Sequence, residues 1–258
     1  MQELNYKGAK IGFTDEGKGT VVVLLHGFLE NITMWNDVVA EVSKRNRVVC
    51  VDLLGHGKTA CVGYIHSMEK MADAVKTVLK ELRIRKAVFI GHSMGGYVSL
   101  AFAEKYPENI KALCLLNSTT QEDSEERKEL RLRASKMAQT NYEALVKMSI
   151  TNLFAEVSHE QFSEEIEIIK TEALKTPVQG YIAGTKGMRL RENKEEVFQT
   201  IEKRLIISGI DDPLLEEQSI KEEGVRTNTP VIFLPHGHMS HIEAKTELIK
   251  ELANFIKA

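Results

Sequence analysis

Two hydrophobic patterns alternate along most of this chain. Short runs of consecutive apolar residues are separated by longer segments in which apolar residues recur every three or four positions. The runs are typical of strands buried on both faces, and the spaced residues are typical of helices with one apolar side. This alternation predicts an α/β protein with a mostly parallel, eight-stranded sheet and helices on both of its faces.

The predicted strands begin with a hairpin and continue with six apolar runs. The hairpin strands lie at 4–7 and 10–14, on either side of Gly8. The six runs are 20–25, 47–52, 87–90, 111–117, 204–209 and 230–234. Helices are predicted at 34–43, 67–82 and 96–106, and a last helix carries on one side Leu248, Ile249, Leu252, Phe255 and Ile256. The strands and helices thus fall into two groups, separated by a long segment of different character.

That segment starts after Ser118, and no strand pattern is found from 121 to about 198. It holds three helix-start signals instead, in which a small polar residue precedes an acidic or amide residue by three positions. These signals begin at Asp123, Thr140 and Ser158. We therefore expect a helical cap of about four helices at 120–200, inserted between two parts of one core at 1–119 and 201–258. The dense charges of both signs at 124–136 are interpreted as a solvated helix face.

Composition and charge narrow the class of protein. Of the 258 residues, 43% are hydrophobic and 28% are charged, and the net charge is −3. These values are ordinary for a globular protein and indicate neither a nucleic-acid nor a membrane partner. The first residues lack the basic and apolar regions of a leader, and no apolar run approaches the ~18 residues of a membrane span. We expect a cytoplasmic protein, a monomer or a small homo-oligomer, with Cys50, Cys61 and Cys114 reduced.

The stretch from Gly91 to Gly95 reads Gly-His-Ser-Met-Gly and carries the strongest chemical signal. A buried strand precedes it and a helix follows, so Ser93 lies on a sharp strand-to-helix turn, the nucleophile elbow. Glycines are needed on both sides because a Cβ there would collide with the crossing backbone. Such a turn holds the Ser93 hydroxyl where a base and a substrate can reach it.

A serine hydroxyl needs a neutral imidazole to accept its proton and a carboxylate to orient that imidazole. In an open parallel sheet these groups lie on loops at the carboxyl ends of strands. Three of the eight histidines, His236, His238 and His241, follow the last strand. His238 is favoured because Gly237 lets the loop turn back and a capping box at 240–243 anchors it. The other five are interpreted as structural, at positions 26, 56, 66, 92 and 159.

The acid and the oxyanion donors are sought at the other strand ends. Asp211 and Asp212 both follow the strand at 204–209, and either could reach His238; the usual Gly-x-x-Asp spacing selects Asp212. An oxyanion hole needs two backbone N–H donors aimed at the developing negative charge. The residue after the nucleophile, Met94, supplies one, and the turn after the strand at 20–25 nominates Phe28 for the other.

Together these motifs resemble the α/β-hydrolase-fold serine hydrolases along nearly the whole chain. The matching pieces are His26-Gly27-Phe28, Asp52-x-x-Gly55-His56-Gly57, Gly91-His92-Ser93-Met94-Gly95-Gly96, Gly209-x-x-Asp212 and Gly237-His238. They occur in the order of nucleophile, acid and base that this fold uses. The N-terminal hairpin and the spacing from His26 to Trp35 resemble small esterases, enol-lactonases and haloperoxidase-like perhydrolases.

The resemblance implies hydrolysis of small carboxylic esters or lactones through an acyl-enzyme. Ser93 would be the nucleophile, His238 the base, Asp212 its orienting acid, and the Phe28 and Met94 N–H groups the oxyanion hole. No cofactor and no metal are expected. Two alternatives remain: C–C bond hydrolysis, thioester hydrolysis or perhydrolysis by the same triad, or a ligand receptor with little turnover. Candidate pocket walls from the cap, each also typical of cap core, are Leu145, Met148, Phe154, Phe162 and Met188.

Overall fold

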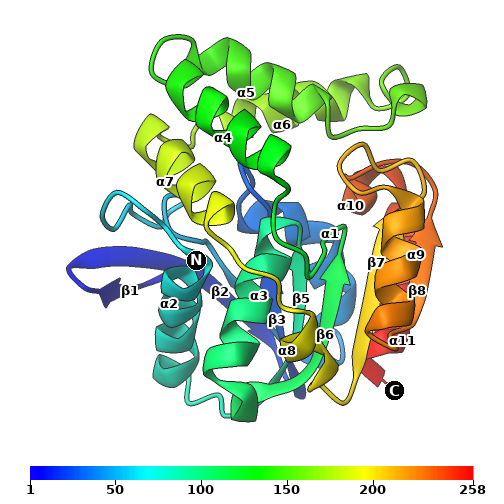
Figure 1. The fold of residues 1–258 in the computed structure, drawn as a ribbon. Coiled ribbons are helices and arrows are strands. Elements are labelled where there is room, and N and C mark those ends of the chain that lie inside the picture. Colours follow the sequence, from blue (N-terminus) through cyan, green and yellow to red (C-terminus); the bar gives the residue numbers. More distant parts are fainter. Residues whose placement is uncertain (258) are drawn as a thin grey trace.

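The protein is described by a computed structural model that covers residues 1–257. Eight strands form one sheet in the order β1-β2-β4-β3-β5-β6-β7-β8 (Figure 1). β1 and β2 pair antiparallel, as do β2 and β4, and all other neighbours are parallel. The strands are β1 (Gln2–Tyr6), β2 (Ala9–Gly17), β3 (Thr20–Leu25), β4 (Asn46–Val51), β5 (Ala87–His92), β6 (Ile110–Leu116), β7 (Arg204–Gly209) and β8 (Val231–Leu234). The predicted mostly parallel, eight-stranded sheet is confirmed.

Helices cover both faces of the sheet, which explains the continuous apolar runs. Successive residues of β3 enter opposite cores: Val23 and Leu25 pack on one face, and Val22 and Leu24 on the other. The first face is covered by α2 (Met68–Glu81), α3 (Met94–Lys105), α8 (Glu195–Gln199) and α9 (Glu217–Arg226). The second is covered by α1 (Asn36–Val42) and α11 (Lys245–Lys257). A strand buried on both sides has no solvent-facing position, so it shows no polar alternation.

The segment between β6 and β7 forms a helical layer above the carboxyl ends of the strands (Figure 1). Its main helices are α4 (Glu125–Met137), α5 (Tyr142–Thr151), α6 (Ser163–Ala173) and α7 (Val178–Arg189). They share a separate apolar cluster that includes Leu145, Ile150, Ile166 and Tyr181. The remaining short helices are η1 (Ile32–Trp35), η2 (Pro107–Asn109), η3 (Glu156–Ser158) and α10 (Ser240–Glu243). Between β6 and β7 lie these four longer helices together with η3 and α8, and the boundaries of the cap at 120 and 200 stay a prediction.

The helix starts inside the cap differ from the three predicted signals. Ser124 caps α4 by accepting a hydrogen bond from the Arg127 N–H (3.2 Å), and the preceding Asp123 is buried among arginines instead. Helix α5 begins at Tyr142, and Ser158 ends a 3₁₀ turn five residues before α6 begins. Asp123 therefore does not cap the helix. Its buried carboxylate pairs with arginine side chains, because a buried charge needs a partner of opposite charge.

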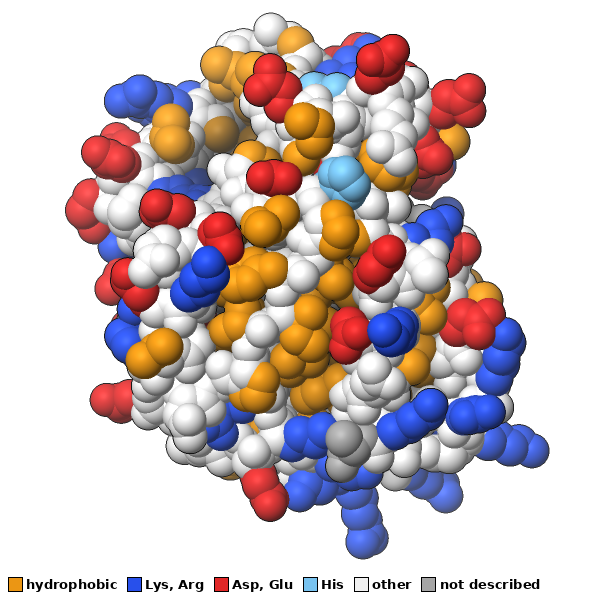
Figure 2. Space-filling model, turned by 90° about the vertical axis from the view of Figure 1, so that its right-hand side faces the viewer, with side chains coloured by type: hydrophobic (Ala, Val, Ile, Leu, Met, Phe, Trp, Pro, Cys, Tyr) orange, Lys and Arg blue, Asp and Glu red, His pale blue; other side chains and the backbone are white. Residues whose placement is uncertain are grey.

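The sheet ends at β8, which pairs with β7 alone. On this side of the molecule hydrophobic side chains gather among charges of both signs (Figure 2). Val225 on α9 and Phe233 on β8 line a shallow groove here, and Val225 is 82% exposed. Within residues 1–257, no helix combines the length and the hydropathy needed to cross a bilayer.

Candidate active site

Ser93 occupies a strained turn between β5 and α3. Its φ is +49° and its ψ is −115°, in the left-handed half of the map that side chains other than glycine rarely adopt. A Cβ on Gly91 would overlap the backbone of Gly95, and a Cβ on Gly95 would overlap the carbonyl of Leu25. Only glycine lets strand, turn and helix approach so closely. The strand–turn–helix geometry predicted for this motif is thus present, and Ser93 lines a cavity beneath the cap.

His238 and Asp212 lie together at the ends of β8 and β7. The Nδ1 atom of His238 is 2.8 Å from Oδ2 of Asp212. Since the carboxylate can only accept, Nδ1 is protonated and donates a hydrogen bond to it. Asp212 also accepts from the Asn117 amide (3.0 Å) and from the backbone N–H groups of Leu214 (2.8 Å) and Leu215 (3.2 Å). Burial alone would raise the pKa of Asp212, but His238 and these donors hold that pKa below its usual value.

The second ring nitrogen of His238 is left for other chemistry. Nε2 is buried and accepts no hydrogen bond from the part of the chain that the structure describes, although His238 lines the same cavity as Ser93. The neighbouring candidates are placed differently. Asp211 is exposed, and its N–H donates to the carbonyl of His236, which is half-buried. The arrangement therefore joins Asp212 to His238, and His238 and Ser93 line one cavity.

The two predicted oxyanion donors are Met94, which follows Ser93 directly, and Phe28, in the loop after β3. Met94 is the first residue of α3, where backbone N–H groups have no carbonyl within the helix to bind. Phe28 follows β3 and lines the cavity, and its ring packs against His56 and Tyr181. Within residues 1–257, neither the Phe28 nor the Met94 N–H donates a hydrogen bond. Their role as oxyanion donors stays a prediction.

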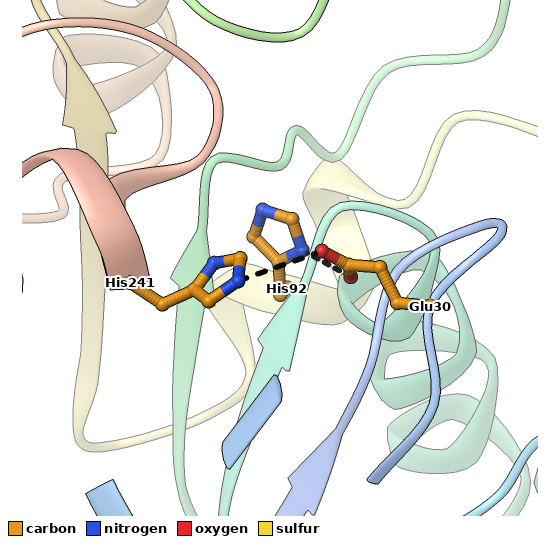
Figure 3. A group of neighbouring side chains, drawn as sticks. All are labelled: Glu30, His92 and His241. Carbon is orange, nitrogen blue, oxygen red and sulfur yellow. Dashed lines mark hydrogen bonds and ion pairs between the residues drawn. The ribbon is translucent and has the colours of Figure 1, made fainter. Parts of the chain in front are cut away.

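A buried ion pair that the sequence did not suggest lies beside this site (Figure 3). Nδ1 of His92 is 2.8 Å from Oε2 of Glu30, and Nε2 of His92 is 3.0 Å from the carbonyl oxygen of His238. Both partners are acceptors, so both ring nitrogens must carry protons and His92 is an imidazolium. Burial opposes both charges, yet each stabilises the other: the pKa of Glu30 falls to about 2, and the pKa of His92 is raised.

The Glu30–His92 pair connects three loops of the site. Oε2 of Glu30 also accepts from the N–H of Gly27 (2.6 Å), next to Phe28 in the loop after β3. His92 belongs to the turn that carries Ser93 and binds the backbone of His238. The pair therefore fixes the loop after β3, the turn that carries Ser93 and the loop of His238 relative to one another.

His241 completes a group that Figure 3 shows with this pair. Its Nε2 is 4.0 Å from Oε1 of Glu30, and burial lowers its pKa to about 4, so it is neutral near pH 7. Glu30, His92 and His241 present ligand atoms within 4.8 Å of one another, the one set of this kind in residues 1–257. A cation would have to displace the proton that His92 shares with Glu30. The absence of a metal from the chemistry stays a prediction.

Other histidines hold loops, as expected. Nε2 of His26 accepts from the N–H of Leu53 (2.9 Å), and Nε2 of His66 accepts from the N–H of Val62 (3.0 Å). His56 donates through Nδ1 to the carbonyl of Leu54 (3.1 Å), and burial lowers its pKa to about 3. These rings are neutral and act as backbone linkers.

The cavity has a volume of about 310 Å³ and lies between the loops at the strand ends and the cap helices. Of the five predicted wall residues, Met188 lines it. Leu145 and Phe154 pack in the cap core, Met148 is 53% exposed, and Phe162 lines a second cavity beside α6. The cap contributes other residues that the sequence reasoning did not nominate: Arg127, Leu130, Arg131, Ala134, Ser149, Asn152, Leu153, Tyr181 and Thr185.

One signal for these residues was present in the sequence. Arg127, Leu130, Arg131 and Ala134 are spaced three and four apart, so they share one face of α4. The interpretation of 124–136 as a solvated face holds for Glu125, Glu126 and Glu129, which are exposed, whereas Arg127, Arg131 and Ala134 are half-buried.

Comparison with solved structures supports the architecture over the full chain. A thermophilic esterase from Thermogutta terrifontis is 26% identical and superposes with a TM-score of 0.93, covering 100% of this chain and 98% of that one. The enol-lactonase from Burkholderia xenovorans LB400 is 22% identical, with a TM-score of 0.92 over 100% of both chains. At that lower identity the likeness shows the fold alone.

Sequence comparison gives the family. An uncharacterized protein of Mycobacterium tuberculosis is 33% identical over 118 residues, which are 46% of this chain and 35% of that protein. The chain thus spans about a third of the length of this curated relative. The profile of the family described as alpha/beta hydrolase fold matches residues 20–245, a range that includes Ser93, Asp212 and His238. The chain belongs to the alpha/beta hydrolase fold family.

Proposed function

We propose that the protein is a serine hydrolase that cleaves small carboxylic esters or lactones. Ser93 is the nucleophile, His238 the general base and Asp212 the carboxylate that orients it. The main support for the proposal is the shared cavity, because Ser93 and His238 both line it. In addition, Nδ1 of His238 donates a hydrogen bond to Asp212 (2.8 Å), which leaves Nε2 to act as the base. The likeness to an esterase over the whole chain supports it.

In this mechanism the Ser93 oxygen bonds to the carbonyl carbon while its proton passes to Nε2 of His238. The Phe28 and Met94 N–H groups stabilise the resulting oxyanion. His238 then protonates the leaving oxygen as the C–O bond breaks, which leaves an acyl group on Ser93. A water molecule repeats both steps, with His238 as base again, and releases the acid. Asp212 keeps the proton on Nδ1 and stabilises the imidazolium formed in each half.

The test is hydrolysis of p-nitrophenyl acetate, butyrate and octanoate by the wild type and by Ser93→Ala. We expect wild-type turnover, with the two shorter esters preferred because the cavity is small, and a loss of at least ~10³-fold in kcat for the variant. Ser219→Ala, an exposed serine on α9, is the matched control and should keep full activity. Turnover that survives in Ser93→Ala, or no turnover of any ester by the wild type, would contradict the proposal.

A further inference from the structure

The cap side of the cavity carries positive charge. Arg127 and Arg131 lie four residues apart on α4, and both line the cavity that Ser93 enters. Their side chains are partly withdrawn from water, at 33% and 16% exposure. Arg133 on the same helix is exposed and does not line the cavity. Two guanidinium groups in the wall of a largely apolar cavity require compensating negative charge.

Asp123 supplies only part of that compensation. Its side chain is fully buried, and three arginines surround it: Arg131 binds it through two nitrogens, Nη1 of Arg191 is 2.8 Å away, and Nε of Arg127 is 3.8 Å away. One carboxylate therefore faces three guanidinium groups. Since arginine stays protonated at any working pH, the cluster keeps an excess of two positive charges.

The other acidic groups near the cavity do not remove this excess. Glu30 lines the cavity but is neutralised by the His92 imidazolium. Asp212 lies behind His238, and four donors already bind it. The acidic residues of α4 are on its exposed side: Glu125, Glu126 and Glu129. Even with Asp212 counted, the cavity and its walls are left net positive.

The two arginines also keep unused donors. Arg127 donates Nη1 to the carbonyl of Leu214 (2.9 Å), while its Nε is too far from Asp123 for a hydrogen bond and its Nη2 makes none within residues 1–257. Nε and Nη2 form the edge of a guanidinium that grips a carboxylate with two parallel bonds, as Arg47 grips Asp15 here at 2.8 and 2.7 Å. Nη1 of Arg131 contacts only the sulfur of Met188, at 3.5 Å.

We propose that Arg127 and Arg131 bind a carboxylate of the substrate, so the preferred substrates are esters or lactones that also carry a free carboxylate. This inference rests on the proposed hydrolase function and narrows its substrate class. The anion would complete the charge balance of the cap cluster, and Arg127 is the principal ligand because it has the free pair of donors. Binding there would hold the substrate at the cap while its ester group meets Ser93.

The experiment compares two esters of nearly equal shape, monoethyl glutarate and ethyl 5-oxohexanoate. They differ in that a carboxylate replaces a methyl ketone. For the wild type we expect kcat/KM to be at least ~10-fold higher for the monoester, through KM. Arg127→Gln should bring the ratio of the two kcat/KM values close to one, and Arg127→Lys should retain part of it. Arg133→Gln on the same helix is the control and should leave the ratio unchanged.

A binding measurement keeps this proposal separate from the hydrolase proposal. Ser93→Ala should bind monoethyl glutarate at least ~10-fold more tightly than the keto ester by calorimetry, and adding Arg127→Gln should abolish the difference. Ser93-dependent hydrolysis of both esters with a ratio near one would overturn the carboxylate site and leave the hydrolase standing. If neither ester is hydrolysed but the monoester binds selectively through Arg127, the hydrolase proposal is overturned and the carboxylate site stands. Equal binding of the two esters overturns the carboxylate site in either case.

Discussion

The two walls of the cavity are built in different ways. On the sheet side, Ser93, Asp212 and His238 lie on short loops at strand ends, and each is fixed by hydrogen bonds to neighbouring loops. On the cap side, separate helices meet around one apolar cluster and one buried carboxylate, Asp123. The sheet side is constrained by backbone geometry and the cap side by side-chain packing. The positions of Ser93, Asp212 and His238 are therefore set by the backbone, while the positions of the cap residues that line the cavity depend on how the cap helices pack.

The largest expected effect falls on the sheet side, from replacing the acid. Asp212→Asn should lower kcat by ~10³–10⁴-fold, because an amide no longer holds the proton on Nδ1 of His238 or stabilises its charge. Initial rates with p-nitrophenyl butyrate measure this. Asp211→Asn is the matched control: its side chain is next in sequence but exposed, so full activity is expected. If Asp211→Asn were the inactive variant, the acid would be assigned to the wrong aspartate.

The buried pair under the nucleophile turn should give the next largest effect. Glu30→Gln removes the charge that keeps His92 doubly protonated, and we expect a loss of about 3 kcal/mol in the free energy of unfolding at pH 6. Urea denaturation measures it. Glu41→Gln, from an exposed pair with Lys44, is the control and should change stability by less than ~0.5 kcal/mol. Equal stability of Glu30→Gln and the wild type would contradict the ion pair.

The same pair predicts a pH dependence. The pKa of Glu30 is about 2 in the folded protein against an ordinary 4.5, so its contribution is present above pH 4.5 and disappears as the pH falls toward 2. His92 sets the upper limit, because its pKa is raised in the folded protein. The contribution of its charge to the free energy of unfolding is complete below pH 6.5, and it is lost as the pH rises through the pKa of His92 in the folded protein. The stability difference between wild type and Glu30→Gln should therefore be greatest between about pH 4.5 and 6.5. A difference that stays constant from pH 3 to 6 would show that folding does not lower the pKa of Glu30.

On the cap side, Asp123→Asn should act more locally. It leaves three arginines without their shared carboxylate, and because two of them can reach solvent we expect a loss of about 2 kcal/mol. Faster amide hydrogen exchange in α4 and α7, with unchanged exchange in β5 and β6, would locate that loss in the cap. The exposed Glu122→Gln is the control. Equal loss of protection in the sheet would mean that the two walls form one cooperative unit.

The sequence predicted the sheet, the strand–turn–helix around Ser93 and the positions of Asp212 and His238 after strand ends, because each of these features depends on local signals. The catalytic roles of the three residues stay predictions. A glycine pair, a strand end and a short spacing restrict where Ser93, Asp212 and His238 can lie. The Glu30–His92 pair joins residues 62 positions apart, and no local pattern links a buried glutamate to the variable residue of the elbow. The spacing of Arg127 and Arg131 places them on one face of α4, but no local pattern shows that this face meets the cavity. Tertiary packing decided both features.

The smallest expected effect concerns where the cap helices start. Ser124→Ala should cost about 1 kcal/mol, because the serine oxygen accepts the Arg127 N–H at the start of α4. Thr140→Ala is the matched control: Thr140 precedes α5 but bonds back to the carbonyl of Met137, so its loss should cost less than ~0.5 kcal/mol. Thermal or urea unfolding of both variants measures the difference. A larger cost for Thr140→Ala would restore the sequence-predicted start of α5. If Ser124→Ala costs more than Thr140→Ala, the geometry at the first turn decides which residue caps a helix. A polar residue three positions before an acidic one is then not sufficient.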